Sequence, residues 1–280
     1  MPDMHPIYSG NPEDFTWAGF GSGSGTNLRE CAKIITPTLV FSDRPKAKLL
    51  QLEELAAVPK ETLDGFRICG SWQAAKGNPE QEAAYWSRAT GFNEQVLNIL
   101  QRHEERIGRG IDLIVLGGYM RFVLDPLLSA YQDRIINVHP ADTSILSYGK
   151  RRFVGGDAVY DAIRAGQRTT RSSVIIVDKQ EDHGENLVQG PEVGVWLEYL
   201  RGTPEERREA ERKYADAHQG LQKVRSDWPA LTTALRFIAD GRLALGTTLD
   251  HAGEWRTVFL DRQPLGYAGF QIAKVEEGGK

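Results

Sequence analysis

The chain has 280 residues, of which 40% are hydrophobic and 26% are charged, and its net charge is −4. This is an ordinary globular composition, with enough length for one large domain or two small ones. The charge includes no long block of Lys and Arg, which argues against a nucleic acid as partner.

Cysteine usage and the N-terminus indicate the compartment. Cys31 and Cys69 lie far apart in apolar segments, which is typical of reduced thiols in a cytosolic protein rather than of a disulfide framework or a zinc site. Residues 1–15 lack the basic-then-apolar pattern of a signal peptide, and no apolar run reaches the roughly 18 residues of a membrane helix. We therefore expect a cytoplasmic protein without a membrane partner.

Strand-like and helix-like segments alternate over the first two thirds of the chain. Strands are expected at 15–20, 38–43, 66–69, 111–118 and 134–139, and helices at 26–34, 46–57, about 80–106 and 123–131. The nearly continuous apolar run at 111–118 is typical of a central parallel strand that is covered on both faces. This order predicts an α/β fold with a doubly wound, mostly parallel sheet, in which ligands bind at the carboxyl ends of the strands.

The pattern changes after about residue 170. Residues 172–190 predict a hairpin with an acidic turn, and 202–219 a highly charged helix with Thr203 as its N-cap. The charge of that helix is typical of a solvated surface. Residues 227–245 predict a better-patterned helix that ends at Gly241.

The stretch GFGSGSGTNL at 19–28 joins the first expected strand to its helix. Glycines let the backbone approach a ligand closely, and a helix N-terminus offers unpaired N–H groups to an anion. No frame of this stretch fits G-x-G-x-x-G and no G-K-[ST] is present, which argues against a dinucleotide fingerprint and a nucleotide P-loop. Two interpretations stay open: a phosphate cradle, or a turn that only caps the helix through Ser24 or Thr26.

Asn137 and His139 end the strand at 134–139, directly before Pro140. Alternate residues of a strand face the same way, so the amide and the imidazole project together. Burying both without partners would be unfavourable. A lone histidine in a strand is more often a core residue, but the neighbouring amide favours an oxyanion-binding pair for acyl or formyl transfer.

A third polar cluster is DKQEDHG at 178–184, which by composition alone fits an ordinary hairpin turn. A functional role requires one of its carboxylates to lie near His139, where it would orient the imidazole and favour its protonated form. His183 in the same turn is a rival candidate, which we expect to be exposed.

Taken in order, these segments resemble the 10-formyltetrahydrofolate-dependent formyltransferase family, and within it most closely the phosphoribosylglycinamide (GAR) formyltransferases. GSGSGTNL is similar to the family's phosphate loop, DLIVLGGYMRFV to its folate-side strand and loop, INVHP to its Asn-x-His-Pro, and VDKQEDHG to its Asp-x-Gly hairpin. The resemblance covers most of residues 15–270. It implies a Rossmann-like formyltransferase domain at 15–280, an N-terminal extension at 1–14 and a helical insertion at about 195–225.

The resemblance also implies three groups of site residues. The catalytic group comprises Asn137, His139 and Asp182. The group that binds 10-formyltetrahydrofolate comprises Arg88, Met120, Arg121, Phe122, Val123 and Asp178. The group that binds the substrate's phosphate comprises Gly23, Ser24, Gly25, Thr26 and Asn27. No metal is implied.

The implied reaction is formyl transfer from 10-formyltetrahydrofolate, a co-substrate, to a primary amine of a phosphorylated small molecule, with GAR of purine biosynthesis as the default acceptor. The amine attacks the formyl carbon while His139 and Asn137 stabilise the developing oxyanion. His139, as the imidazolium supported by Asp182, then protonates the leaving nitrogen.

Several alternatives stay open. The acceptor could be an amino sugar or another metabolite amine, or water could be the nucleophile, as in a 10-formyltetrahydrofolate hydrolase. A non-catalytic folate- or nucleotide-binding module is a further class, and an NAD-dependent oxidoreductase is disfavoured by the missing fingerprint. A second copy of the chain, in a homodimer, is an open alternative among the partners.

Two segments depart from the family's pattern. The segment after the catalytic His-Pro, ADTSILSYGKRRFVGG, is longer than in the family and bears Lys150, Arg151 and Arg152. It is either a solvated loop or a contact to an anionic substrate or to the folate's glutamate tail. The family's ribose-binding glutamate would fall near Val224 and is missing there.

Overall fold

The computed structural model describes residues 3–196, 203–250 and 253–273. The chain divides into an N-terminal unit, which comprises residues 13–137 and 177–180, and a C-terminal unit, which comprises the other described residues. Within the described ranges, no helix has the length and apolarity that crossing a membrane would require.

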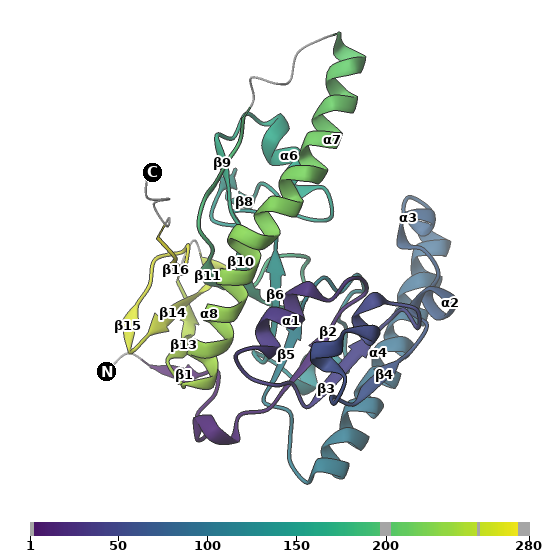
Figure 1. The fold of residues 1–280 in the computed structure, drawn as a ribbon, viewed down its shortest axis with the longest axis vertical. Helices are drawn as coiled ribbons and strands as arrows, with labels where there is room; N and C mark the ends of the chain where they lie inside the picture. Colours follow the sequence, from purple (N-terminus) through teal and green to yellow (C-terminus); the bar gives the residue numbers. More distant parts are fainter. Residues whose placement is uncertain (1–2, 197–202, 251–252, 274–280) are drawn as a thin grey trace. The chain divides into compact units, whose positions relative to one another are not determined.

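A parallel sheet forms the centre of the N-terminal unit (Figure 1). Its strands pair in the order β6-β5-β2-β3-β4, and every pair is parallel. The strands are β2 (Trp17–Phe20), β3 (Leu39–Ser42), β4 (Lys60–Thr62), β5 (Leu113–Leu116) and β6 (Ile135–His139). The last two residues of β6 are counted with the C-terminal unit. The expected α/β class with a mostly parallel sheet is confirmed.

Helices pack on both faces of this sheet, as the doubly wound prediction requires. The helices are α1 (Thr26–Ala32), α2 (Gly65–Cys69), α3 (Trp72–Ala75), α4 (Pro79–Ile107) and α5 (Leu127–Ala130). In β2, Gly19 faces α1, where an added Cβ would lie 3.1 Å from Leu28. Its neighbours Ala18 and Phe20 face the opposite way and share a buried core with Phe92 of α4. Successive residues of β2 therefore point to opposite faces of the sheet, one face covered by α1 and the other by α4.

One predicted strand of this unit is wrong. Residues 66–69 form helix α2, because the Asp64 side chain accepts a hydrogen bond from Arg67 N and so caps the helix. Gly70 ends α2 with φ of 80°. The strand that joins the sheet here is β4, which the sequence pattern did not indicate.

The helix expected at 46–57 is also wrong. Only two short 3-10 turns form there, η2 (Lys48–Gln51) and η3 (Glu53–Leu55). Leu49 N donates a 3.0 Å hydrogen bond to the carbonyl of Gly23 in the glycine turn. This bond replaces the bond to the residue four positions earlier that an α-helix would require. A further 3-10 turn, η1 (Pro12–Asp14), precedes β2.

Two sheets organise the C-terminal unit. One is antiparallel, in the order β1-β13-β14-β15, with β1 (Met4–Pro6), β13 (Leu243–Leu249), β14 (Arg256–Leu260) and β15 (Gln263–Pro264). The other contains the predicted hairpin, β10 (Ser173–Ile176) antiparallel to β11 (Asn186–Gln189), with β16 (Phe270–Gln271) parallel to β11. Two short ladders pair β7 (Leu146–Ser147) with β8 (Lys150–Arg151) and β9 (Thr169–Thr170) with β12 (Val193–Gly194).

The helices of this unit are α6 (Ala158–Arg164), α7 (Pro204–Gln222) and α8 (Trp228–Ala239). A π-helical turn, η5 (Lys223–Asp227), joins α7 to α8 in one continuous rod (Figure 1). Thr203 and Glu206 form a capping box at the start of α7, which confirms the predicted N-cap. Residues 1–2 of the predicted extension and 197–202 of the predicted insertion lie outside the described residues.

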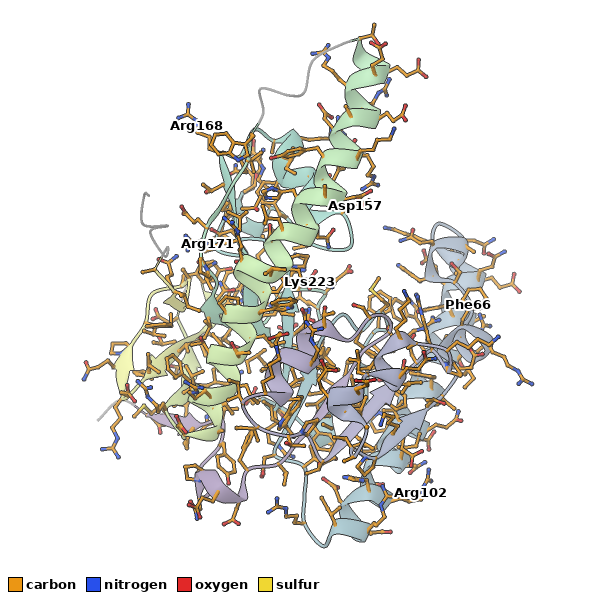
Figure 2. All side chains as sticks on the ribbon, in the orientation of Figure 1. Phe66, Arg102, Asp157, Arg168, Arg171 and Lys223 are labelled. Carbon is orange, nitrogen blue, oxygen red and sulfur yellow. The ribbon has the colours of Figure 1, made fainter. Side chains whose placement is uncertain are left out.

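Most of α7 is exposed, as its charge predicted, but one stripe is buried. Ala215, His218 and Gln222 recur at helical spacing on that stripe, and Ala215 packs with Val159 and Ile163 of α6. In the N-terminal unit, Phe66 of α2 and Arg102 of α4 are also exposed; both are labelled in Figure 2.

The core of the N-terminal unit yields a stability prediction. Phe92→Ala should lower the free energy of unfolding by about 3–5 kcal/mol, because the ring is 1% exposed and lies 6.5 Å from the ring of Phe41. Urea unfolding measures the change. The control Glu94→Ala, exposed on the same helix, should change it by about 0.5 kcal/mol or less; similar values for both variants would contradict this core.

Candidate active site

The glycine turn of the N-terminal unit forms the start of α1. Gly25 is the N-cap of α1 and has φ of 71°, and an added Cβ would lie 2.3 Å from Leu49 Cδ1. Only glycine fits this position. The N-terminus of α1 has no side-chain cap, so the interpretation in which Ser24 or Thr26 caps the helix is wrong. The hydroxyl of Thr26 is buried without a hydrogen-bond partner among the described residues.

A buried network ties the glycine turn to the loop after β5. Ser22 Oγ donates to Asp43 Oδ1 and accepts a 2.8 Å hydrogen bond from Met120 N. Arg121 Nε lies 3.2 Å from Asp43 Oδ2. Burial by itself would lower the pKa of Arg121, but its hydrogen bonds to Tyr85 and Asp43 outweigh burial and raise it. The Arg121 guanidinium, predicted to bind the folate, is therefore engaged inside the protein.

Asp43 is a buried acidic residue, bonded to residues of the predicted site, that the sequence reasoning missed. It is 0% exposed and follows β3 directly, at the carboxyl end of a parallel strand. A charged residue immediately after the apolar run 38–42 was the available signal, because ligands bind at this edge of a parallel sheet.

Of the other residues predicted to bind the folate, Phe122 and Val123 belong to a core cluster that contains Trp72 and Trp86. Phe122 lies 5.0 Å from the ring of Trp86 and 6.0 Å from that of Trp72. Val123 is buried and Met120 is 65% exposed. Asp178 is half-buried and accepts a 2.8 Å hydrogen bond from the amide of Gln180.

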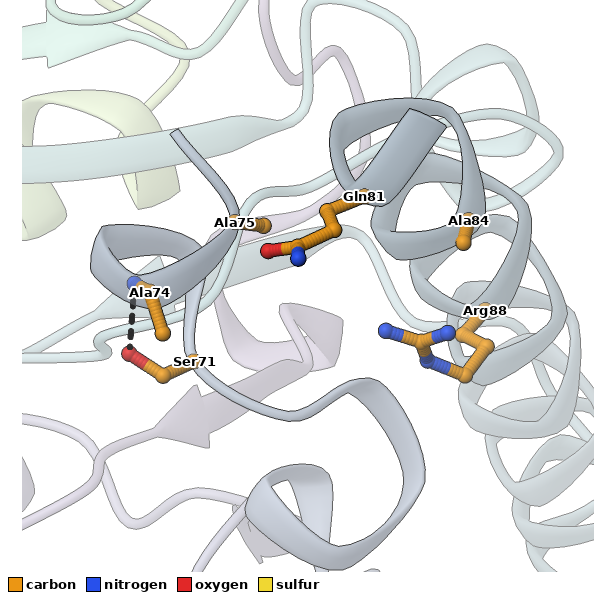
Figure 3. A pocket seen from close by; sticks show the side chains of 6 residues that line it. All are labelled: Ser71, Ala74, Ala75, Gln81, Ala84 and Arg88. Atoms are coloured by element: carbon orange, nitrogen blue, oxygen red, sulfur yellow. Dashed lines mark hydrogen bonds between the residues drawn. The ribbon is translucent and has the colours of Figure 1, made fainter. Parts of the chain in front are cut away.

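A hollow of about 270 Å³ lies between α3 and α4 (Figure 3). It is lined by Ser71, Ala74, Ala75, Gln81, Ala84 and Arg88. Arg88 is exposed, its Nε donates a 3.2 Å hydrogen bond to Cys69 O, and its guanidinium points into the hollow (Figure 3). The hollow can thus take a carboxylate or another anionic group.

Asn137 and His139 stand at the carboxyl end of β6. The prediction from the strand pleat, that both side chains face the same way, stays a prediction, because Asn137 belongs to the N-terminal unit and His139 to the C-terminal unit. Asn137 is half-buried, and its carboxamide has no hydrogen-bond partner in the part of the chain that the structure describes. His139 is 3% exposed, so the nitrogens of its ring need hydrogen-bond partners from the protein or from a ligand.

Within the C-terminal unit, both nitrogens of the His139 ring face oxygen atoms. Nδ1 lies 3.2 Å from Asp182 Oδ2, and Nε2 lies 3.0 Å from the carbonyl oxygen of Phe153. Carboxylate and carbonyl oxygens only accept hydrogen bonds, so the doubly protonated ring is the form that can donate to both.

The turn that carries Asp182 has an unusual backbone. Asp182 has φ of 50°, and its Oδ2 also accepts a 2.8 Å hydrogen bond from Gly155 N. At Gly184 an added Cβ would lie 2.0 Å from the carbonyl oxygen of Ile176, so the Asp-x-Gly pattern has a steric cause. His183, expected to be exposed, is half-buried instead, with Nε2 3.4 Å from Glu254.

The segment after His139 and Pro140 folds partly against this turn. Lys150 and Arg152 are exposed, as expected for a solvated loop. Arg151 is 9% exposed and donates to the carbonyl oxygens of Asp182 and Gly184. The solvated interpretation is therefore wrong for Arg151, whereas a contact of this loop to an anionic substrate or to the folate's glutamate tail stays a prediction.

The buried stripe of α7 reaches the residue that follows His139. Gln222 Nε2 donates a 2.8 Å hydrogen bond to the carbonyl oxygen of Pro140, and Gln222 Oε1 accepts from Thr170. The Thr170 hydroxyl also contacts His218, whose pKa is lowered by burial. The helix predicted as an insertion thus supports the end of β6, whereas Val224 beyond it is 48% exposed.

The two cysteine thiols and the possible metal ligands are further candidate reactive groups. Cys31 and Cys69 are free and buried, and burial raises the pKa of both thiols, which makes them poor nucleophiles. Over the described ranges, no three residues of the His, Cys, Asp and Glu types are grouped to hold a metal ion.

Fold and motifs together define a formyltransferase. The formyl transferase family matches residues 20–213, and the chain belongs to this family. Over 180 residues it is 32% identical to the phosphoribosylglycinamide formyltransferase of Bacillus subtilis (strain 168), across 62% of this chain and 76% of that protein. The resemblance inferred from the motifs is confirmed.

Solved structures share the fold. The phosphoribosylglycinamide formyltransferase of Coxiella burnetii has a TM-score of 0.59 and 21% identity, and the match covers 92% of this chain and 99% of that chain. A formyltetrahydrofolate deformylase of Pseudomonas putida KT2440 has a TM-score of 0.53 and 15% identity, over 90% of this chain and 72% of that chain. At these identities the likeness establishes the fold alone.

Glu185, directly after the Asp-x-Gly turn, forms an ion pair that bears on pH. It is 7% exposed and lies 2.7 Å from Arg256 Nε. Burial by itself would raise the pKa of Glu185, but the Arg256 guanidinium outweighs burial and holds that pKa below its ordinary value.

This pair gives the second prediction. Because the pKa of Glu185 is lower in the folded chain than its ordinary 4.5, the carboxylate adds stability above that range and loses it as pH falls through the lowered value. The stability difference between wild type and Glu185→Gln should therefore be largest near about pH 7 and shrink below about pH 4. Urea unfolding across this range measures it, and a difference independent of pH would contradict the ion pair's role.

Proposed function

We propose that this formyltransferase transfers the formyl group of 10-formyltetrahydrofolate to the primary amine of phosphoribosylglycinamide, in the cytoplasm. The observation that carries the proposal is the approach of Asp182 to His139 at the end of β6. The identity shared with the Bacillus subtilis enzyme supports this acceptor.

Each catalytic residue has a role that its surroundings support. In the reaction 10-formyltetrahydrofolate supplies the formyl carbon and the leaving nitrogen. The Asn137 carboxamide, which has no hydrogen-bond partner in the described part of the chain, donates to the formyl oxygen as negative charge develops there. One such donor is worth about two to three orders of magnitude in rate.

His139 acts as the general acid. Its imidazolium delivers a proton toward the leaving nitrogen, and the Asp182 carboxylate, 3.2 Å away, stabilises the charged ring and holds its orientation. General acid catalysis of this kind contributes about two to four orders of magnitude. The carbonyl of Phe153 occupies Nε2, so this nitrogen reaches a substrate only after the segment around Phe153 shifts.

The N-terminal unit binds the two substrates. The turn at Gly23–Asn27 takes the phosphate, because its amides begin a helix and no side chain caps them. Arg88, Met120, Arg121, Phe122, Val123 and Asp178 form the folate side, where the exposed Arg88 offers a cation and Phe122 a ring next to Trp86.

The catalytic roles are tested by substitution. Asn137→Ala, His139→Ala and Asp182→Asn should each lower kcat by about a hundredfold or more, with the fold intact by circular dichroism. The exposed neighbour Lys179→Met is the control and should keep kcat within about twofold. Wild-type turnover in all three variants would reject these roles.

The acceptor is tested by a screen with 10-formyltetrahydrofolate that follows the release of tetrahydrofolate. Phosphoribosylglycinamide, several amino-sugar nucleotides and a sample without acceptor are compared. We expect phosphoribosylglycinamide to give the highest kcat/KM. Release without any acceptor would instead identify a hydrolase, and transfer to an amino sugar alone would replace the proposed acceptor.

A further inference from the structure

Arg151 is a buried arginine in a segment that departs from the family's pattern. It lies in β8 and is 9% exposed. Its Nη1 donates a 2.6 Å hydrogen bond to the carbonyl oxygen of Asp182, and its Nη2 a 2.7 Å hydrogen bond to that of Gly184. One planar guanidinium thus holds the turn on both sides of His183.

The remaining carbonyl of this turn has its own anchor. Trp255 Nε1 donates a 2.5 Å hydrogen bond to the carbonyl oxygen of His183. Arg151 lies over the rings of Trp255 and Tyr267, at 5.5 and 5.7 Å, and its Nε donates to the Tyr267 hydroxyl at 3.0 Å. Three successive carbonyls are therefore fixed by two side chains that also pack against each other.

The turn needs such anchors because its backbone is strained. Asp182 has φ of 50°, a left-handed backbone conformation that a residue with a side chain keeps chiefly where its surroundings impose it. The same residue directs Oδ2 to His139 Nδ1. If the turn relaxes, the carboxylate moves away from the imidazole.

We propose that Arg151 is a positioning residue for formyl transfer: its guanidinium, together with the Trp255 indole, holds the Asp182 turn so that the carboxylate stays against His139. This inference rests on the proposed function for the roles of Asp182 and His139. Arg151 itself touches neither substrate in this account and acts only through Asp182.

Substitutions that remove the donors one at a time test the inference. Arg151→Met removes both hydrogen bonds to the turn, Arg151→Lys keeps the charge with a single donor centre, and Trp255→Phe keeps a ring without the N–H. The control is Lys150→Met, in the same strand but exposed. Arg151→Met should lower kcat about tenfold or more with KM for both substrates within about threefold, and Arg151→Lys should lie between.

A double-mutant cycle separates positioning from general support of the fold. Because Arg151 acts through Asp182, Arg151→Met should change kcat by less than about twofold when Asp182 is already Asn. An equal loss in both backgrounds, or no loss in the wild-type background, overturns the inference. If Arg151→Met does not fold, Arg151→Lys and Trp255→Phe in the same two backgrounds replace it, with the same expected and contrary results.

A structural measurement keeps this inference distinct from the proposed function. In a crystal structure of Arg151→Lys, or of Trp255→Phe, the distance from Asp182 Oδ2 to His139 Nδ1 should exceed about 4 Å, beyond ion-pair contact. An unchanged distance overturns the positioning role whatever the activity. Suppose that Asp182→Asn keeps wild-type turnover, while the distance lengthens in Arg151→Lys or Trp255→Phe. The proposed roles of Asp182 and His139 then fail, but the conclusion that Arg151 and Trp255 hold the turn in place is retained.

Discussion

The contact between the Asp182 carboxylate and the His139 imidazole, 3.2 Å from oxygen to nitrogen, is the constraint on which the rest of the site depends. His139 is held by a strand, whereas Asp182 is held by a turn whose backbone is strained. Catalytic geometry tolerates errors of well under about 1 Å. The protein therefore surrounds the turn with hydrogen bonds to main-chain carbonyls, which fix position more tightly than apolar packing does.

Two segments that the sequence predicted to depart from the family's pattern lie around this contact. The loop after His139 and Pro140 supplies Phe153 O to the His139 ring and Gly155 N to the Asp182 carboxylate. The charged helix α7 supplies Gln222, which hydrogen-bonds to the carbonyl of Pro140. Phe153 and Gln222 are buried, and with Gly155 they form part of the surroundings of His139 and Asp182, the two side chains proposed to be catalytic.

In the N-terminal unit, the buried carboxylate of Asp43 is likewise held by hydrogen bonds from other segments. Asp43 is fully buried and bonds to both Ser22 and Arg121, so one carboxylate joins the glycine turn to the loop predicted to bind the folate. A buried charge of this kind is tolerated only with partners. Its partners here come from two different strand ends, and this links the phosphate-binding and folate-binding predictions through a single residue.

The amino-acid sequence by itself determined the α/β class, the long helix expected at about 80–106, the strand that ends at His139 and the family, because periodicity and short motifs are local properties of the chain. It did not determine α2: the pattern at 66–69 predicted a strand, but a helix capped by the Asp64 side chain forms there. Nor could it reveal that Asp43 and Arg151 are buried and bonded beside the predicted site residues, since both look like ordinary charged residues until folding supplies their partners. Only the tertiary structure decided those assignments, because burial and hydrogen bonding between segments distant in the chain are not encoded in local pattern.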